Sequence, residues 1–253
     1  MLRWNRQPLE AVLLDLDDTI LDNQAGLEAA WARVAAELAG RLGDVPAPAV
    51  RAALAAASDW YWSDDERHRT GRLDMPGSRR AVIGRVLDVL GRPDPRLADD
   101  VSALYTALRD ASYAPFPGAL EALARLRACA PALGLVTNGA ADAQRAKIER
   151  WDLARYFDVI AIEGEVGAGK PDPRHFGHAL GALGADPAAT LMAGDNYHCD
   201  VLGALALGLH AVWIDREGRV APPVAGAAPP GTGSRRPHRT LASFVELAGE
   251  LGV

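Results

Sequence analysis

Cysteine and lysine are both scarce in this sequence of 253 residues. The two cysteines, Cys129 and Cys199, are too few for a disulfide framework, and such low usage is typical of a reducing cytoplasm. Lys147 and Lys170 are the only lysines, so arginine supplies nearly all of the 27 basic residues. Beside abundant alanine, glycine and proline, this bias most simply reflects the nucleotide composition of the gene.

Long hydrophobic runs and an excess of positive charge are also missing. No uncharged apolar run approaches the ~20 residues that a membrane-spanning helix needs. The first ten residues carry Arg3, Arg6 and Glu10, and they lack the apolar core of a signal peptide. The net charge of −6 disfavours nucleic acid as a partner, because proteins that track phosphates are usually basic. We therefore expect a cytoplasmic protein, monomeric or homodimeric, that binds neither nucleic acid nor membranes.

The composition that is present, 49% hydrophobic and 24% charged, is that of a globular protein. Residues 11–14, AVLL, predict a strand buried on both faces, since all four side chains are apolar. From residue 23 to 112 the pattern changes to helices without strands, with apolar residues recurring every three or four positions. Four helices are expected in this stretch, at residues 27–38, 48–70, 78–90 and 96–108.

After the sequence APFPG at 114–118, helices and strands alternate. Strands are expected at residues 133–139, 157–164, 190–196 and 210–215, followed by a Pro/Gly-rich loop at 217–237 and a last helix at 240–251. Such alternation predicts parallel strands with helices on both faces. The expected fold is therefore α/β, a doubly wound, Rossmann-like parallel sheet formed by residues 1–22 and 113–253. A helical domain at 23–112 is inserted directly after its first strand.

Polar residues follow four of the expected strands, and the carboxyl ends of parallel strands meet at one edge of a sheet. Taken singly, each group has an ordinary explanation as a helix cap, a turn or an exposed loop. Together they bring the carboxylates of Asp15, Asp17, Asp195 and Asp200, the hydroxyl of Thr137 and the ammonium group of Lys170 to the same edge. They are Asp15-Leu16-Asp17-Asp18-Thr19, Thr137-Asn138-Gly139, Lys170 within GEVGAGKPDP, and Gly194-Asp195-Asn196 with Asp200.

These motifs resemble those of the haloacid dehalogenase-like (HAD) hydrolase superfamily. DLDDT, VTNG, GKPDP and GDNYHCD occur here in the order that the superfamily shows, and the helical insertion stands where its helical C1 cap domain stands. The resemblance spans residues 11 to about 214. It implies that Asp15 is a nucleophile that forms an aspartyl-phosphate, and that Asp17 is the general acid and base.

The same resemblance implies a magnesium ion and a phosphate site. The metal would be held by Asp15, the backbone carbonyl of Asp17, Asp195 and Asp200, a set of oxygen ligands that suits Mg²⁺. The phosphoryl group would be bound by Thr137, Asn138, Gly139 and Lys170. A shared cation also explains why a buried strand would end in several carboxylates, which otherwise repel one another and resist burial.

Several chemistries share this scaffold. Dehalogenases lack the aspartate two residues after the nucleophile, whereas Asp17 is present here. Phosphonate-cleaving members need a lysine in the cap, and residues 23–112 contain none. We therefore predict a phosphomonoesterase that acts on a small phosphorylated metabolite. A sugar phosphomutase on the same scaffold stays open as an alternative, and a non-enzymatic, receiver-like phosphorylation switch is the rival outside enzymes.

The cap sequence says less about the substrate. Residues 60–80 combine three aromatic side chains with several arginines, among which Arg69 and Arg72 are candidates for binding an anionic leaving group. In a chain so rich in arginine, a solvated helix that packs its tryptophans on a hydrophobic core explains the same residues at least as well.

Overall fold

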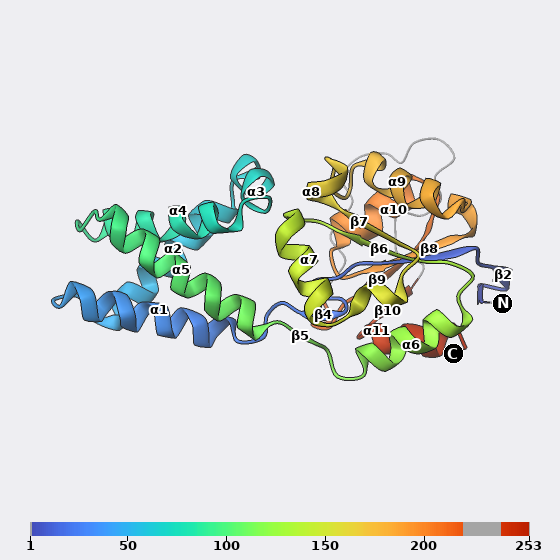
Figure 1. Ribbon diagram of the computed structural model, residues 1–253, viewed down its shortest axis with the longest axis horizontal. Coiled ribbons are helices and arrows are strands. Elements are labelled where there is room, and N and C mark those ends of the chain that lie inside the picture. Colours follow the sequence, from blue (N-terminus) through green and yellow to red (C-terminus); the bar gives the residue numbers. More distant parts are fainter. Residues whose placement is uncertain (1, 220–238, 253) are drawn as a thin grey trace. The chain divides into compact units, whose positions relative to one another are not determined.

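The computed structural model describes residues 2–219 and 239–252. The chain forms two compact units (Figure 1). The core unit comprises Met1–Asp22 and Pro115–Val253, and the cap unit comprises Asn23–Ala114.

The core unit is built on a six-stranded parallel sheet. In chain order its strands are β3 (Ala11–Leu14), β6 (Leu133–Thr137), β7 (Val159–Ile162), β8 (Thr190–Gly194), β9 (His210–Ile214) and β10 (Arg239–Leu241). They lie side by side in the order β10-β9-β8-β3-β6-β7, with all neighbours parallel. The first strand is therefore central, and the strand order reverses beside it, at the point where open α/β sheets bind ligands. The predicted Rossmann-like fold is confirmed.

Alternate side chains of the central strand pack into two hydrophobic clusters, one on each face of the sheet. Val12 and Leu14 pack with residues of α6 (Ala119–Cys129) and α11 (Phe244–Glu250), whereas Leu13 packs with residues of α9 (Pro173–Leu183) and α10 (Gly203–Ala206). Figure 1 shows these two pairs of helices on opposite sides of the sheet. The helical segments of the core unit are α6 (Ala119–Cys129), α7 (Ala141–Arg150), α8 (Glu163–Val166), α9 (Pro173–Leu183), α10 (Gly203–Ala206), α11 (Phe244–Glu250), two 3₁₀ turns (Leu153–Tyr156 and Pro187–Ala189) and a π-helical segment (Tyr197–Leu202).

The C-terminal part differs from the sequence-based expectation. The helix expected at 240–251 begins only at Phe244, where Ser243 caps it by accepting a hydrogen bond from the backbone N–H of Glu246. The residues before it form β10, which extends the sheet next to β9. The proline- and glycine-rich stretch expected to be a loop, 217–237, lies outside the described residues from 220 onward.

The four remaining strands of the described residues form two short two-stranded sheets. β1 (Arg3–Trp4) and β2 (Gln7–Pro8) form an antiparallel hairpin before the central strand. β4 (Leu21–Asp22) and β5 (Ala114–Pro115) form a two-stranded sheet, and they lie at the two points where the chain passes between the units.

Five helices make up the cap unit, one more than expected. They are α1 (Leu27–Leu42), α2 (Ala47–Trp62), α3 (Asp65–Gly71), α4 (Met75–Val89) and α5 (Pro95–Ser112). The single helix expected at 48–70 is divided, because Asp64 adopts an extended backbone and its carboxylate caps α3 by accepting from the N–H of Arg67 at 2.8 Å. The cap unit has its own hydrophobic cluster, built from α1, α2, α4 and α5.

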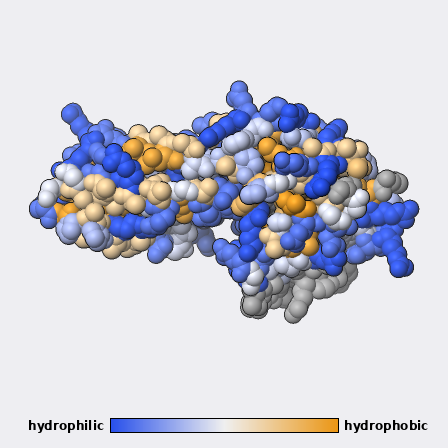
Figure 2. All heavy atoms as spheres, turned by 90° about the horizontal axis from the view of Figure 1, so that it is seen from below, coloured by the Kyte–Doolittle hydropathy of each residue, from blue (hydrophilic) through white to orange (hydrophobic). Residues whose placement is uncertain are grey.

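Within the described residues, no helix combines the length and the apolar character that crossing a membrane requires. On the face of the molecule seen in Figure 2, hydrophobic residues form limited patches among hydrophilic ones.

Candidate active site

A tight turn follows β3 and carries the first acidic residues. The backbone N–H groups of Ile20 and Leu21 both donate to the carbonyl of Leu16 at 2.9 Å. Asp18 has a positive φ of 58°, a conformation that aspartate tolerates better than most residues. The side chain of Thr19 is fully buried; its hydroxyl donates to Asp15 at 3.3 Å and accepts from the N–H of Asp195 at 3.1 Å. Thr19 therefore links the loops that follow two neighbouring strands.

Three carboxylates from these loops come together. Asp15, Asp195 and Asp200 each offer an oxygen, and these oxygens all lie within 4.8 Å of one another. Asp15 and Asp200 are buried, and Asp195 is half-buried. The π-helical segment delivers Asp200, whose carboxylate accepts from the N–H of Asn196 at 2.9 Å. The sheet edge thus concentrates negative charge where water is largely excluded.

This crowding changes the acidity of the cluster. Burial, helped by Asp200 and Asp17, raises the pKa of Asp15 to about 7, although Lys170 opposes the shift. Burial and the carboxylates of Asp15 and Asp200 raise the pKa of Asp195 to about 8. When all three carboxylates are ionised, as metal binding requires, they and the ammonium of Lys170 together carry two net negative charges, which one divalent cation would balance. Carboxylate oxygens are the donors that hard cations such as Mg²⁺ select, so the residues fit a metal of that kind.

Lys170 is held between two of these carboxylates although its side chain is only 2% exposed. Its Nζ lies 2.5 Å from an oxygen of Asp15 and 2.7 Å from an oxygen of Asp200. Burial alone would lower the pKa of Lys170, but the two carboxylates raise it above its usual range, so the ammonium stays charged. The side chain of Asn138 fixes the lysine backbone: it accepts from the N–H at 2.7 Å and donates to the carbonyl at 2.8 Å.

Hydrogen bonds within the protein hold the residues that end and follow β6. Thr137 is 1% exposed, and its hydroxyl accepts from the amide of Gln144 at 2.8 Å. Gly139 has a φ of 118°, which favours glycine, and its N–H donates to Glu163 at 2.9 Å. The polar ends of β3, β6 and β8 are thus side by side, as their places in the sheet require.

Two residues that the sequence patterns did not single out also reach the site. Nζ of Lys147 lies 2.8 Å from both carboxylate oxygens of Asp17, and Nε2 of Gln144 donates to one of them at 3.0 Å. Both residues come from α7 and are three positions apart, so they share one face of the helix. The signal available in the sequence was that spacing, directly after the Thr137 motif, together with the rarity of lysine.

Arg69 and Arg72, the cap residues singled out in the sequence, belong to α3 and its C-terminus. The guanidinium of Arg69 is exposed and pairs with Glu66 at 2.6 Å. Arg72 is half-buried. A role of either residue in substrate binding stays a prediction.

This chain is similar to known proteins of the class that its fold and acidic site suggest. A family model described as haloacid dehalogenase-like hydrolase matches residues 9–208. A phosphoserine phosphatase of Thermus thermophilus is 35% identical over 236 residues, which cover 86% of this chain and 93% of that protein. An N-acylneuraminate-9-phosphatase of Mus musculus is 38% identical over 152 residues, which cover 60% of this chain and 50% of that protein.

Among solved structures, a putative HAD hydrolase from Bacillus subtilis, YfnB, bound to magnesium, superimposes with a TM-score of 0.70 at 21% identity, covering 98% of this chain and 100% of that one. At that identity the likeness concerns the fold. The family match and the identity to the Thermus protein show more: this chain belongs to the haloacid dehalogenase-like hydrolases, with a helical cap inserted after the first core strand.

Proposed function

We propose that this protein is a magnesium-dependent phosphomonoesterase that acts on a small phosphorylated metabolite through a phosphoryl group carried by Asp15. The observation that carries the proposal is the placement of Asp15: it lies 2.5 Å from Lys170, within the acidic cluster, and two residues before a second carboxylate. The relatives named phosphatases support the same reaction class.

In the first half of the reaction, a carboxylate oxygen of Asp15 attacks phosphorus and the bond from phosphorus to the leaving oxygen breaks. Asp17 gives its proton to that oxygen, so the product leaves as an alcohol. Lys170 faces Asp15 and offsets the negative charge of the incoming phosphoryl group. Thr137, at the end of the adjacent strand, is the candidate hydroxyl donor to a phosphoryl oxygen.

In the second half, water attacks the phosphorus of the aspartyl-phosphate and Asp17 takes its proton. The bond between phosphorus and the Asp15 oxygen breaks, which releases inorganic phosphate and restores the carboxylate. Lys147 and Gln144 hold the Asp17 carboxylate from the side of α7 in the structure, so its position is defined before substrate arrives.

Asp15, Asp195 and Asp200, with the backbone carbonyl of Asp17, are the candidate metal ligands. When bound, Mg²⁺ supplies positive charge that neutralises the carboxylates and the phosphoryl oxygens. The carboxylate count and the balance of charge in the cluster support this choice.

Asp17 argues against dehalogenase activity, because by the family resemblance dehalogenases lack an aspartate at this position. A phosphomutase would keep both aspartates, so the reaction must be distinguished experimentally by its dependence on a bisphosphorylated sugar.

The test is hydrolysis of p-nitrophenyl phosphate with Mg²⁺, comparing the wild type with Asp15→Asn and with Asp142→Asn, an exposed residue of α7 as the control. We expect many turnovers by the wild type and the control and none by Asp15→Asn. Excess EDTA should stop the reaction, and added Mg²⁺ should restore it. Full activity of Asp15→Asn, or a single stoichiometric and long-lived phosphorylation of the wild type, would contradict the proposal; the latter result would indicate a switch.

A further inference from the structure

The cap unit contains a cavity of about 250 Å³ that none of the motifs explains. All fourteen residues that line it belong to the cap unit. The volume exceeds the ~150 Å³ of a cavity known to accommodate benzene. The cavity is therefore large enough for a small organic molecule.

Positive charge without an acidic residue in the lining distinguishes this cavity. Arg79 and Arg109 line it and are 7% and 4% exposed, whereas no acidic residue is among the lining residues. The nearest carboxylate paired with Arg79 is Asp110, at 3.8 Å, and that side chain is 62% exposed. A buried guanidinium whose paired carboxylate is distant and solvated is only partly compensated, so the cavity is electrostatically suited to a negatively charged ligand.

The two arginines differ in how far the protein already satisfies them. Arg109 donates to the backbone carbonyls of Asn23 and Ala25 and to the hydroxyl of Ser112, so it holds the first residues of the cap unit in place. Arg79 makes long polar contacts: its Nη2 donates to the hydroxyl of Tyr113 at 3.5 Å, and its Nη1 lies 3.8 Å from the exposed carboxylate of Asp110. Its buried Nε has no hydrogen-bond partner among the described residues. Arg79 is therefore the side chain with donor capacity left for a ligand.

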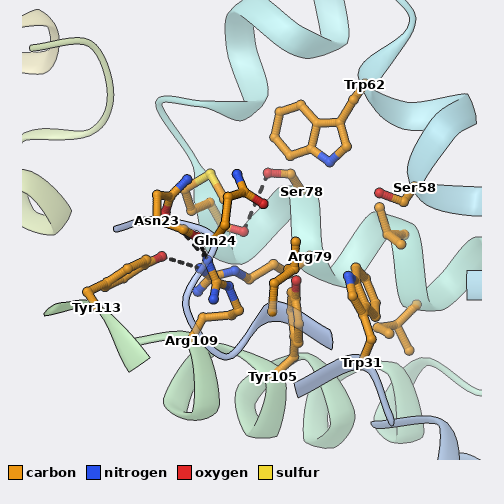
Figure 3. A pocket seen from close by; sticks show the side chains of 14 residues that line it. Asn23, Gln24, Trp31, Ser58, Trp62, Ser78, Arg79, Tyr105, Arg109 and Tyr113 are labelled. Atoms are coloured by element: carbon orange, nitrogen blue, oxygen red, sulfur yellow. Dashed lines mark hydrogen bonds between the residues drawn. The ribbon is translucent and has the colours of Figure 1, made fainter. Parts of the chain in front are cut away.

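The aromatic residues that line the cavity indicate the shape of the uncharged part of the ligand. Trp31 stacks on Tyr105 with ring centroids 4.3 Å apart, and the guanidinium of Arg79 lies 5.5 Å from the centre of the Tyr105 ring. Figure 3 shows Trp31 and Trp62 on one side of the cavity and Tyr113 on the other, with Arg79 between them. Flat aromatic walls favour a planar or ring-bearing body.

We propose that this cavity binds a small organic carboxylate with a planar or apolar body, and that Arg79 determines its specificity by a forked, charge-assisted hydrogen bond to the carboxylate. One negative charge matches the one incompletely bonded guanidinium. The carboxylate can be part of the phosphorylated substrate or a separate ligand of the cap; the first source rests on the proposed phosphatase function, and the second does not.

The binding test uses benzoate and phenylacetate, each compared with its neutral amide, benzamide or phenylacetamide. Quenching of tryptophan fluorescence and titration calorimetry on the full chain measure the affinity, since two tryptophans line the cavity. We expect each acid to bind at least tenfold more tightly than its amide. Equal affinity of acid and amide, or no binding of either acid, would overturn the proposal without any need for a variant.

Variants then assign the effect to Arg79. Arg79→Gln should lose the preference for the acid, and Arg79→Lys, which keeps the charge but not the fork, should keep part of it. Arg80→Gln is the matched control, because Arg80 is the next residue of α4, is exposed and pairs with Asp99. Melting curves verify that each variant is folded. Unchanged discrimination in a folded Arg79→Gln protein would refute the assignment.

A kinetic arm distinguishes the two sources. If the carboxylate belongs to the substrate, benzoate should raise KM for p-nitrophenyl phosphate without changing kcat; if it is a separate ligand, benzoate should change kcat. Should the protein show no phosphatase activity at all, the proposed function fails, while the binding experiments still decide the inference about the cavity.

Discussion

Nζ of Lys147 bridges both carboxylate oxygens of Asp17, each at 2.8 Å, across 130 positions of sequence. The pair is partly shielded from water, with the lysine side chain 13% and the aspartate side chain 27% exposed. Gln144 adds a donor to the same carboxylate and another to the hydroxyl of Thr137. The proposed acid and base is thus connected to the proposed phosphate site by one helix face.

We expect Lys147→Met to lower kcat about tenfold or more while KM changes little, since positioned acid and base groups contribute ~10²–10⁴ in rate. The loss should depend on the leaving group. An alkyl phosphate needs a proton on its leaving oxygen, whereas p-nitrophenolate leaves easily without one, so the alkyl substrate should suffer more. Steady-state kinetics with glycerol phosphate and p-nitrophenyl phosphate measure the difference.

Arg145→Met is the matched control for that substitution, because Arg145 also lies on α7 but pairs with Glu165 in an exposed position. It should leave both rates nearly unchanged. An equal loss for both substrates in Lys147→Met would indicate a general structural defect and would contradict the positioning role.

Magnesium should stabilise the protein more strongly as the pH rises. The pKa values of Asp15 and Asp195, about 7 and about 8, exceed their usual 3.8, so the metal-free folded state retains protons that the unfolded chain releases. Their contribution to stability is fully present below about pH 4 and is lost as the pH rises through 7 to 8. Metal binding requires the deprotonated forms, so protons no longer compete at high pH.

At a Mg²⁺ concentration of 100 times Kd, the expected gain is about 2.7 kcal/mol, or roughly 5–10 °C in Tm for a protein of this size. At a fixed Mg²⁺ concentration the gain should be larger at pH 8 than at pH 6.5. Melting curves with and without the metal test this. Asp195→Asn should lose most of the gain, and Asp88→Asn, an exposed residue of α4, should keep it. A gain that falls between pH 6.5 and 8 would contradict the assigned ligands.

Much of the core site is predictable from sequence for a physical reason: buried parallel strands read as apolar runs, and the polar residue that ends each run lies at the ligand-binding edge. Asp15, Thr137 and Asp195 follow from this rule. The strand-end rule also places Lys170 at this edge, but Lys170 lies in a loop, so its role beside Asp15 was implied only by the family resemblance. The contacts of Gln144 and Lys147 with Asp17 depend on how α7 packs after the chain has crossed the sheet, which no local pattern encodes.

The errors in the fold have local causes. α2 and α3 share one helical composition, and only the capping by Asp64 divides them. β10 has three residues, Arg239, Thr240 and Leu241, too few for a periodic pattern, and it is a strand because it pairs with β9. Tertiary pairing decides such short segments.

Gly194 should be intolerant of a side chain. A Cβ at this last residue of β8 would lie 2.2 Å from a carboxylate oxygen of Asp200, far inside contact distance. Gly194→Ala should displace Asp200 and weaken Mg²⁺ binding about tenfold or more, measured by titration calorimetry. Gly181→Ala, in α9 with nothing within 4 Å of the added atom, is the control and should bind normally. Normal affinity in Gly194→Ala would show that Asp200 is not needed where the structure places it.

His175 should make the protein lose stability below pH 6.5. Its side chain is fully buried, and burial together with Lys170 lowers its pKa from 6.5 to about 4. Above pH 6.5 the imidazole is neutral in both states; below it, the unfolded chain gains a proton that the folded protein excludes, so folding weakens until about pH 4. At pH 5 this loss amounts to about 2 kcal/mol.

Urea unfolding at pH 7.5 and pH 5 measures the effect of that group. His175→Leu places an apolar side chain that cannot be protonated at this buried position, so the fall in unfolding free energy between the two pH values should shrink by about 2 kcal/mol. His178→Gln, an exposed position of the same helix, removes a histidine without touching the buried site and serves as the control. If His175→Leu loses as much stability on acidification as the wild type, another group is responsible, because the leucine has no proton to gain.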